Sequence, residues 1–167
     1  LDLSRLDAGR LELKKKEYHL SEALASALLM LRKELEAHTV HLDCPEEIRV
    51  FADFSLLRQA VVLILHNAAM YTPAGTEVNI SAELSGSDTV LRICDTGPGT
   101  EEKDLEMLFE KFYRGQQRKP GGAGLGLALA RGIAELHNGS LTAQRNLPSG
   151  LCFTIRLPSQ VSSSSSS

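Results

Sequence analysis

The chain has 167 residues, of which 43% are hydrophobic and 23% are charged, and its formal net charge is −3. At roughly 150 residues per domain this length favours a single domain, which can bury enough surface to fold without disulfides or a structural metal. The mild charge argues against a protein that coats nucleic acid or an anionic membrane, and the longest apolar run, residues 60–65, is far too short to span a bilayer.

The first part of the chain predicts two helices and two strands. Leucines at a three-to-four-residue spacing indicate the end of an amphipathic helix over residues 1–16. Ser21 is placed to cap a second helix, whose leucine-bearing face fades near His38. Two short strands are then expected at residues 40–43 and 48–51, on either side of a turn.

A long core helix and a hairpin are expected next. Asp53 is placed to cap a helix over residues 54–70, which is apolar around most of its circumference, as core helices are. Residues 78–84 alternate between apolar and polar side chains, and residues 89–94 follow after a turn, which predicts a strand hairpin. A further helix is expected over residues 125–137, where an Asn-Gly pair ends it. The last two expected strands are residues 140–145 and 151–157.

Between residues 97 and 122 the periodicity is lost, apart from a short helical piece over residues 103–109. So long a gap inside a domain is typical of a functional loop or lid. Residues 162–167 are all serine and are expected to be disordered. Strand hairpins separated by helices predict an α+β fold, in which three helices pack on one face of a mixed, mainly antiparallel sheet.

Cysteine and glycine are distributed in different ways. Cys44, Cys94 and Cys152 are widely spaced and form no CxxC pair. This spacing favours buried free thiols in a reducing compartment over a disulfide framework or a zinc site. Four of the 13 glycines fall within residues 121–126 and two more within residues 95–99, which indicates a backbone that turns sharply or lets another group approach closely.

The first segment that carries chemistry is Asp95-Thr-Gly-Pro-Gly, at the end of an expected strand. An ionised Asp is a pure hydrogen-bond acceptor, suited to an exocyclic amine such as N6 of adenine. Gly97 and Gly99 would let the backbone pass beside a flat ring. The alternative is a tight Pro-Gly turn that Asp95 caps.

The second segment is Gly121-Gly-Ala-Gly-Leu-Gly126, which opens a helix. Free N–H groups at a helix start form an anion site that the helix dipole strengthens. The context excludes a dinucleotide-binding fingerprint, because no strand precedes the glycines, and the segment lacks the Lys-Ser/Thr pair of a P-loop. The alternative is a flexible hinge.

Two further segments carry polar groups in unusual places. His66 and Asn67 lie within the apolar core helix, where a polar pair needs partners or a cavity. Asn67 offers a neutral oxygen to a phosphate-bound magnesium, whereas His66 is more typical of a structural histidine. The aromatic-rich residues 108–114 lie in a loop that is acidic before Lys111 and basic after it, which would place positive charge near phosphates. The alternative is a solvated loop with an aromatic anchor.

Four segments of this chain closely resemble, in order and spacing, the N, G1, F and G2 boxes of sensor histidine kinases. The matching residues are Asn67, DTGPG (95–99), LFEKFYRG (108–115) and GAGLGLAL (122–129). The resemblance covers residues 1–158, because LDLSRLDAGRLEL and GLCFTIRLP also match. It implies the two-layer α/β sandwich of the Bergerat-type ATP-binding fold, shared with DNA gyrase, MutL and the heat-shock chaperone ATPases, with a lid over the nucleotide.

The resemblance implies a role for each matching residue. Asn67 would hold Mg²⁺ as a catalytic residue, and Tyr71 would line the base or sugar of ATP. Asp95 would take the adenine amine in a pocket shaped by Gly97 and Gly99. Arg114, also a catalytic residue, would contact the γ-phosphate. The phosphates would also be contacted by the backbone amides of Gly122, Gly124, Leu125 and Gly126.

An apolar residue stands at four positions where the family commonly has a polar one, namely Leu63, Met70, Ala123 and Leu151. Loss of an amine at Met70 removes a charge-assisted contact worth about 1.5–3 kcal/mol. Two functions therefore stay open: an ATP-binding kinase domain, or a degenerate nucleotide-binding scaffold without phosphotransfer. A hydrolytic ATPase of the gyrase or MutL type is disfavoured, because Leu63 leaves no glutamate to activate water.

The resemblance also implies a division of the chain. Residues 1–16 would end a dimerisation helix, residues 20–158 would be the catalytic ATP-binding domain, and residues 159–167 would be a serine-rich tail. None of the 5 histidines has a phosphoacceptor context, so this chain alone would not autophosphorylate. The implied partners are the upstream dimerisation domain and a response regulator receiver domain, with no nucleic acid. The fragment would be monomeric and cytoplasmic, in a homodimeric parent that can be anchored in the inner membrane.

Overall fold

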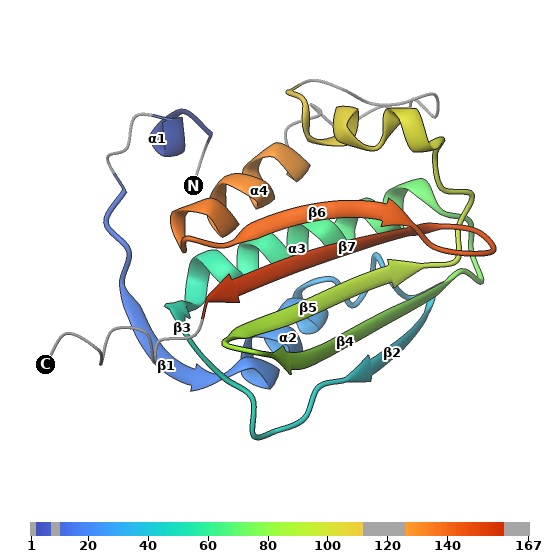
Figure 1. Cartoon of the computed structure of the whole chain (residues 1–167). Helices are drawn as coiled ribbons and strands as arrows, with labels where there is room; N and C mark the ends of the chain where they lie inside the picture. The colour runs from blue at the N-terminus through green and yellow to red at the C-terminus, as the bar shows by residue number, and fades with distance from the viewer. Residues whose placement is uncertain (1–2, 8–10, 112–125, 159–167) are drawn as a thin grey trace, which may run out of the picture.

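The computed structural model describes residues 3–7, 11–111 and 126–158. The helices are α1 (Leu3–Asp7), α2 (Leu20–Met30), α3 (Phe54–Tyr71) and α4 (Gly126–Leu136), with two 3-10 helices, η1 (Glu102–Asp104) and η2 (Glu106–Phe109). The strands are β1 (Lys15–His19), β2 (Thr39–Asp43), β3 (Arg49–Asp53), β4 (Glu77–Ser85), β5 (Asp88–Asp95), β6 (Ser140–Arg145) and β7 (Leu151–Pro158). A five-stranded sheet of order β2-β4-β5-β7-β6 forms one layer, and α2, α3 and α4 cover one of its faces (Figure 1).

The sheet is mixed and mainly antiparallel, which confirms the predicted α+β class. β4 and β5 form the expected hairpin, β5 lies antiparallel to β7, and β7 lies antiparallel to β6. β2 lies parallel to β4. Ile80, Ile93 and Phe153 are in register on neighbouring strands and are each almost fully buried. The alternating pattern of these strands therefore reflects one face that the helices cover and one that they leave open.

The amino-terminal stretch differs from the prediction of a helix over residues 1–16. Among its described residues only Leu3–Asp7 is helical, and Lys15 and Lys16 belong to β1. β1 pairs antiparallel with β3 from Lys15 opposite Asp53 onward. The backbone N–H and C=O groups of β3 need a partner strand, and β1 supplies it at the cost of the helix that local periodicity favours. The two strands predicted as neighbours across a turn, β2 and β3, therefore lie in different sheets.

α2 begins and ends earlier than predicted. Its N-cap is His19 rather than Ser21, and the helix ends at Met30, although the leucine pattern continues beyond it. Leu31 and Leu35 nevertheless remain buried, and the Leu35 N–H donates to the Leu31 carbonyl at 2.9 Å. The leucine spacing in this stretch thus reports burial in consecutive turns as well as a helix.

α3 and α4 form where they are predicted. Asp53 caps α3, because its Oδ1 accepts a hydrogen bond from the Leu56 N–H at 3.1 Å. After α4 the chain turns at Asn138, whose φ of 60° lies in the left-handed region that Asn tolerates. The helical piece expected at residues 103–109 is present as η1 and η2. In the described part of the chain, none of the helices combines the length and the apolar character that crossing a bilayer would take.

The prediction of free thiols is wrong for two of the three cysteines. Cys94 on β5 and Cys152 on β7 lie directly opposite each other and form a disulfide, with their Cα atoms 4.0 Å apart. Cys44 is a free cysteine. The disulfide joins residues 58 positions apart, and strand register, which brings them together, cannot be seen in cysteine spacing.

A buried histidine joins the end of α4 to the start of α3. His137 is 4% exposed. Its Nδ1 lies 2.8 Å from the Ile133 carbonyl oxygen, and its Nε2 lies 3.0 Å from the backbone nitrogen of Asp53. A carbonyl accepts and an N–H donates, so the ring is neutral with its proton on Nδ1. The Asp53 Oδ2 in turn accepts from the Lys14 N–H at 3.0 Å, which ties the segment before β1 to the same point.

We expect the free energy of unfolding to fall as the pH drops below about 6.5, the ordinary pKa of histidine. Burial lowers the pKa of His137. The unfolded chain therefore binds a proton that the folded protein excludes, and the stability present above about pH 6.5 is lost as the pH falls towards the folded-state pKa. Urea unfolding at a series of pH values measures this slope.

The matched variant for this pH dependence is His137→Gln. Its side-chain oxygen can still accept from the Asp53 N–H, and it does not titrate. We expect a flatter dependence of stability on pH in this variant, together with some loss of stability at high pH, because the bond to Ile133 is gone. If the slope persisted unchanged, another group would have to be its source.

Candidate functional site

Three elements bring the described site residues together: the second half of α3, the end of β5 and the start of α4. A Cβ added at Gly126, the first residue of α4, would lie 3.6 Å from the Leu63 side chain of α3. Asn67 follows one turn after Leu63, so it shares that helix face, and it is half-buried. Tyr71, also half-buried, is the last residue of α3. The start of α4 therefore lies beside the face of α3 that carries Asn67.

The other predicted polar and glycine residues fall into two groups. His66 is exposed, so it needs no buried partner and contributes nothing visible to the site. Four predicted residues, Arg114, Gly122, Gly124 and Leu125, lie outside the described residues. The described phosphate-side residues of the prediction are therefore Asn67 and Gly126.

Asp95 is the buried acid of the site. It ends β5 and is only 4% exposed. Its Oδ1 accepts hydrogen bonds from the Gly97 N–H at 2.9 Å and from the Leu151 N–H at 3.3 Å. Burial raises the pKa of Asp95, and these two donors and the nearby His38 oppose that rise. Both donors that the described residues supply bind Oδ1, so Oδ2 would remain as an acceptor for an amine of a ligand.

The β6–β7 hairpin holds Asp95 in place, which sequence reasoning missed. The Asn146 side-chain amide donates to the Asp95 carbonyl at 2.7 Å. Gly150 approaches so closely that an added Cβ would overlap the Asp95 carbonyl oxygen. With the Leu151 N–H on the carboxylate, the hairpin fixes both the backbone and the side chain of Asp95. The Pro-Ser-Gly turn predicted a hairpin here, but no local signal says what the hairpin packs against.

A second group of unpredicted residues lies between α3 and Asp95. The Thr72 hydroxyl, just after α3, donates to the Ala68 carbonyl at 2.6 Å. Because that hydroxyl proton is committed, the Nε2–H of His38 donates to the same oxygen at 2.8 Å. A Cβ at Gly97 would overlap the Thr72 methyl group. Thr72 therefore packs directly against Gly97, whose N–H orients the Asp95 carboxylate.

The two glycines after Asp95 are both required by packing within the protein. Gly97 is next to Thr72, and a Cβ at Gly99 would lie 2.8 Å from the Gly150 carbonyl oxygen. Gly99 also has a φ of +72°, which favours glycine. The groups that approach these glycines within the structure are parts of the same chain. The approach of a flat ring beside Gly97 and Gly99 remains a prediction.

Phe109 anchors the segment that precedes the expected lid. It is 6% exposed and packs edge-on against Phe153 of β7, with ring centroids 6.2 Å apart. The Arg131 guanidinium of α4 lies 3.8 Å from the Phe109 ring centroid and 3.3 Å from the Glu106 carboxylate. The interpretation of an aromatic anchor therefore holds for Phe109, while the basic residues after Lys111 lie outside the described residues.

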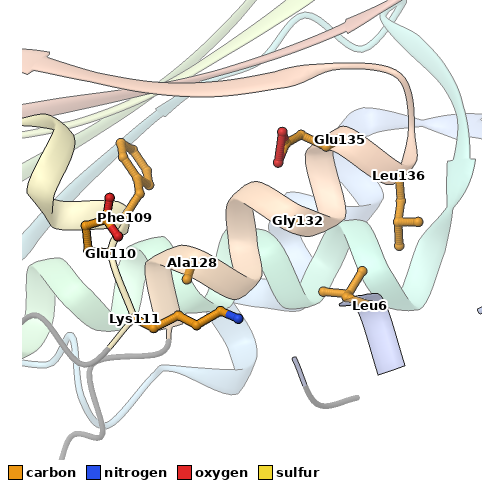
Figure 2. A pocket seen from close by; sticks show the side chains of 8 residues that line it. All are labelled: Leu6, Phe109, Glu110, Lys111, Ala128, Gly132, Glu135 and Leu136. Carbon is orange, nitrogen blue, oxygen red and sulfur yellow. The ribbon is translucent and has the colours of Figure 1, made fainter. Parts of the chain in front are cut away.

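A pocket of about 560 Å³ lies on α4, between α1 and the end of η2 (Figure 2). The residues that line it are Leu6, Phe109, Glu110, Lys111, Ala128, Gly132, Glu135 and Leu136. A Cβ at Gly132 would lie 3.0 Å from the Leu6 side chain, so the bare backbone of Gly132 lets α1 pack closely on α4. Of the predicted site residues that the structure describes, none lines this pocket, which makes it distinct from the Asp95 site.

Within residues 3–7, 11–111 and 126–158, no three His, Cys, Asp or Glu side chains gather as a metal site. Magnesium that is bound through the phosphates of a nucleotide keeps water ligands and takes only one or two ligands from the protein. The half-buried amide of Asn67 beside the start of α4 fits that limited role.

Comparison with known proteins identifies the family of the chain. The family described as "Histidine kinase-, DNA gyrase B-, and HSP90-like ATPase" matches residues 52–161, more than half of the chain. The chain belongs to this ATPase family. It is 35% identical over 162 residues to Sensor protein KdpD of Escherichia coli (strain K12), a match over 96% of this chain and 18% of that protein. It is 36% identical over 165 residues to Histidine protein kinase DivJ of Caulobacter vibrioides, over 95% of this chain and 27% of that protein.

A solved structure of a sensor histidine kinase is also similar to the chain. The mycobacterial sensor histidine kinase MprB superposes with a TM-score of 0.79 at 28% identity, over 86% of this chain and 97% of that one. The resemblance to sensor histidine kinases and the predicted fold are thereby confirmed: the chain is a member of the ATPase family of the sensor histidine kinase type. It spans 18% and 27% of the two curated relatives.

Proposed function

We propose that this domain binds Mg²⁺-ATP and presents it for phosphoryl transfer to a histidine on an upstream dimerisation domain. The observation that carries the proposal is the Asp95 carboxylate, which is buried at the end of β5 with both described donors on Oδ1. Membership of an ATPase family supports ATP as the nucleotide. Oδ2 of Asp95 would then accept from the exocyclic amine of adenine, which guanine does not offer at that position.

At the other end of the nucleotide, α3 and α4 supply the contacts. The first N–H groups of a helix lack partners within the helix and favour phosphate, so the start of α4, described from Gly126 onward, would offer such groups to the nucleotide. The Asn67 oxygen, on the adjacent face of α3, would hold Mg²⁺ together with the phosphates. When it is bound, Mg²⁺ neutralises negative charge on the phosphate groups during phosphoryl transfer. The role of the chain is thus to position the nucleotide and its charge, with Arg114 proposed at the γ-phosphate and Tyr71 beside the base or sugar.

The proposal extends to the parent protein. The residues before β1 would end a dimerisation segment, and residues 159–167 would form a tail. The catalytic unit, expected over residues 20–158, would also include β1 (Lys15–His19), because β1 pairs with β3. Autophosphorylation of the histidine would then need the upstream segment, in a homodimer. A response regulator receiver domain would accept the phosphoryl group from that histidine in a second step. The relatives support this place in signalling, because they are named as a sensor protein and a histidine protein kinase.

One observation favours a second function, a nucleotide-binding scaffold without phosphotransfer. The α3 side chain nearest to the first residue of α4 is Leu63, an apolar group at the phosphate end of the proposed site. Isothermal titration of ATP and ADP, with and without Mg²⁺, followed by incubation of the full-length protein with labelled ATP, separates the two functions. Binding with histidine phosphorylation supports the kinase, and binding alone supports the scaffold. Absence of binding of both nucleotides would refute both functions.

We expect Met70→Lys to tighten ATP binding several-fold. Met70 is half-buried one turn after Asn67, where the family commonly has a Lys that faces the phosphates. A new ammonium would regain part of a charge-assisted contact worth about 1.5–3 kcal/mol, and solvent would screen the rest. The control is Met30→Lys, which adds the same charge at an exposed position on α2. Equal affinities for the two variants would contradict this account of position 70.

A further inference from the structure

The Cys94–Cys152 disulfide lies beside the hydrogen bond that orients Asp95. Cys94 immediately precedes Asp95 on β5, and Cys152 immediately follows Leu151 on β7. The Leu151 N–H donates to the Asp95 Oδ1 at 3.3 Å. The covalent link and the hydrogen bond therefore connect the same two strands at adjacent positions.

The two cysteines lie on the side of the sheet away from the proposed nucleotide site. Successive residues of a strand point to opposite faces, so the two cysteines lie on the opposite face of the sheet from Asp95 and Leu151. Their neighbours in register are Asn79 of β4 and Gln144 of β6, both exposed polar residues. Cys94 is half-buried and Cys152 is 9% exposed, so Cys94 is the more accessible thiol.

The disulfide also closes the end of a strand ladder. Cys94 and Cys152 are the last pair in the register of β5 with β7. The end of a ladder opens more readily than its middle. Beyond this pair come Asp95 on one strand and, on the other, the hairpin that holds Asp95 through Asn146 and Gly150. A covalent bond at the last pair thus keeps the hairpin seated on Asp95.

We infer that Cys94 and Cys152 are a reversible thiol–disulfide site, and that its disulfide form binds adenine nucleotide more tightly than its dithiol form; this rests on the proposed function of Asp95. The reaction partner is a small disulfide of the glutathione class. The Cys94 thiolate attacks one sulfur of that disulfide and releases one thiolate. The Cys152 thiolate then attacks the Cys94 sulfur and releases the second thiolate, so that two protein thiols are oxidised and one small disulfide is reduced.

The test is isothermal titration of ADP into the 167-residue chain after equilibration with oxidised or with reduced glutathione. Thiol counting in each sample should give one free thiol, that of Cys44, after oxidation, and three after reduction. We expect the dissociation constant to be about three- to tenfold larger for the reduced chain, because ordering the hairpin then opposes binding. Cys44→Ala should keep this difference, and the Cys94→Ser/Cys152→Ser double variant should lose it and bind as the reduced chain does.

The outcomes separate this inference from the proposed function. Equal ADP affinity of the oxidised and reduced chains would overturn the redox effect and leave the nucleotide site standing. Three titratable thiols after treatment with oxidised glutathione would overturn the disulfide itself. Absence of ADP binding in both states would overturn the proposed function, and the inference with it.

Discussion

Asp95→Asn is expected to weaken ADP binding about ten- to a hundredfold while the fold is retained, which corresponds to the loss of a charge-assisted hydrogen bond of about 1.5–3 kcal/mol. The Gly97 and Leu151 N–H groups both point at Oδ1, so the amide oxygen of the variant would stay there. Its NH₂ group would then take the place of Oδ2 and oppose the amine of adenine, donor against donor.

Asp88→Asn is the matched control for this experiment. It is the same substitution on the same strand, at an accessible ion pair with Arg156 3.1 Å away. Isothermal titration should show wild-type affinity for this variant, and circular dichroism should show that both variants are folded. If Asp95→Asn bound ADP as tightly as Asp88→Asn, Asp95 would not be the adenine acceptor.

Gly150→Ala is expected to lower the free energy of unfolding by about 2–6 kcal/mol, the sum of backbone strain and overpacking at about 1–3 kcal/mol each. Gly150 has a φ of +110°, and a Cβ there would overlap the Asp95 carbonyl oxygen. The hairpin would have to move away from Asp95 to make room. We therefore expect any folded fraction to bind nucleotide more weakly as well.

Gly86→Ala separates the two contributions. Gly86 also has a positive φ, +61°, but a Cβ at this position would meet nothing within 4 Å. Gly86→Ala should therefore lower the free energy of unfolding only through backbone strain, by about 1–2 kcal/mol. Urea unfolding of both variants measures the difference, and equal losses of stability would show that the contact between Gly150 and Asp95 carries no energetic weight.

Local signals predicted much of the fold. Asp53 before an apolar run identified the start of α3, and the Asn138-Gly139 pair identified the end of α4, because capping depends on residues that are neighbours in sequence. β1 escaped prediction, since its pairing with β3 depends on residues far along the chain. The disulfide escaped for the same reason: register across β5 and β7 decides it.

The candidate site divides in a similar way. The segment from Asp95 to Gly99 was conspicuous, because an acid followed by two glycines is unusual wherever it occurs. Thr72, His38 and Asn146 carry no such mark, yet they form the hydrogen bonds and contacts around Asp95. The role of a residue that supports another residue can be identified only in the folded chain, because that role depends on contacts between residues that are distant in sequence.

The pairing of β1 with β3 also decides where the chain can be shortened for expression. A protein trimmed to begin at residue 20, where the resemblance places the catalytic domain, would lose all of β1 and the Lys14 N–H that binds Asp53. Of the strands that the structure describes, β1 is the one that pairs with β3, so the shortened protein would leave β3 unpaired among them, with the exposed Phe51 at its centre. Such an unpaired strand is a template for aggregation, so a soluble fragment should begin no later than Lys14.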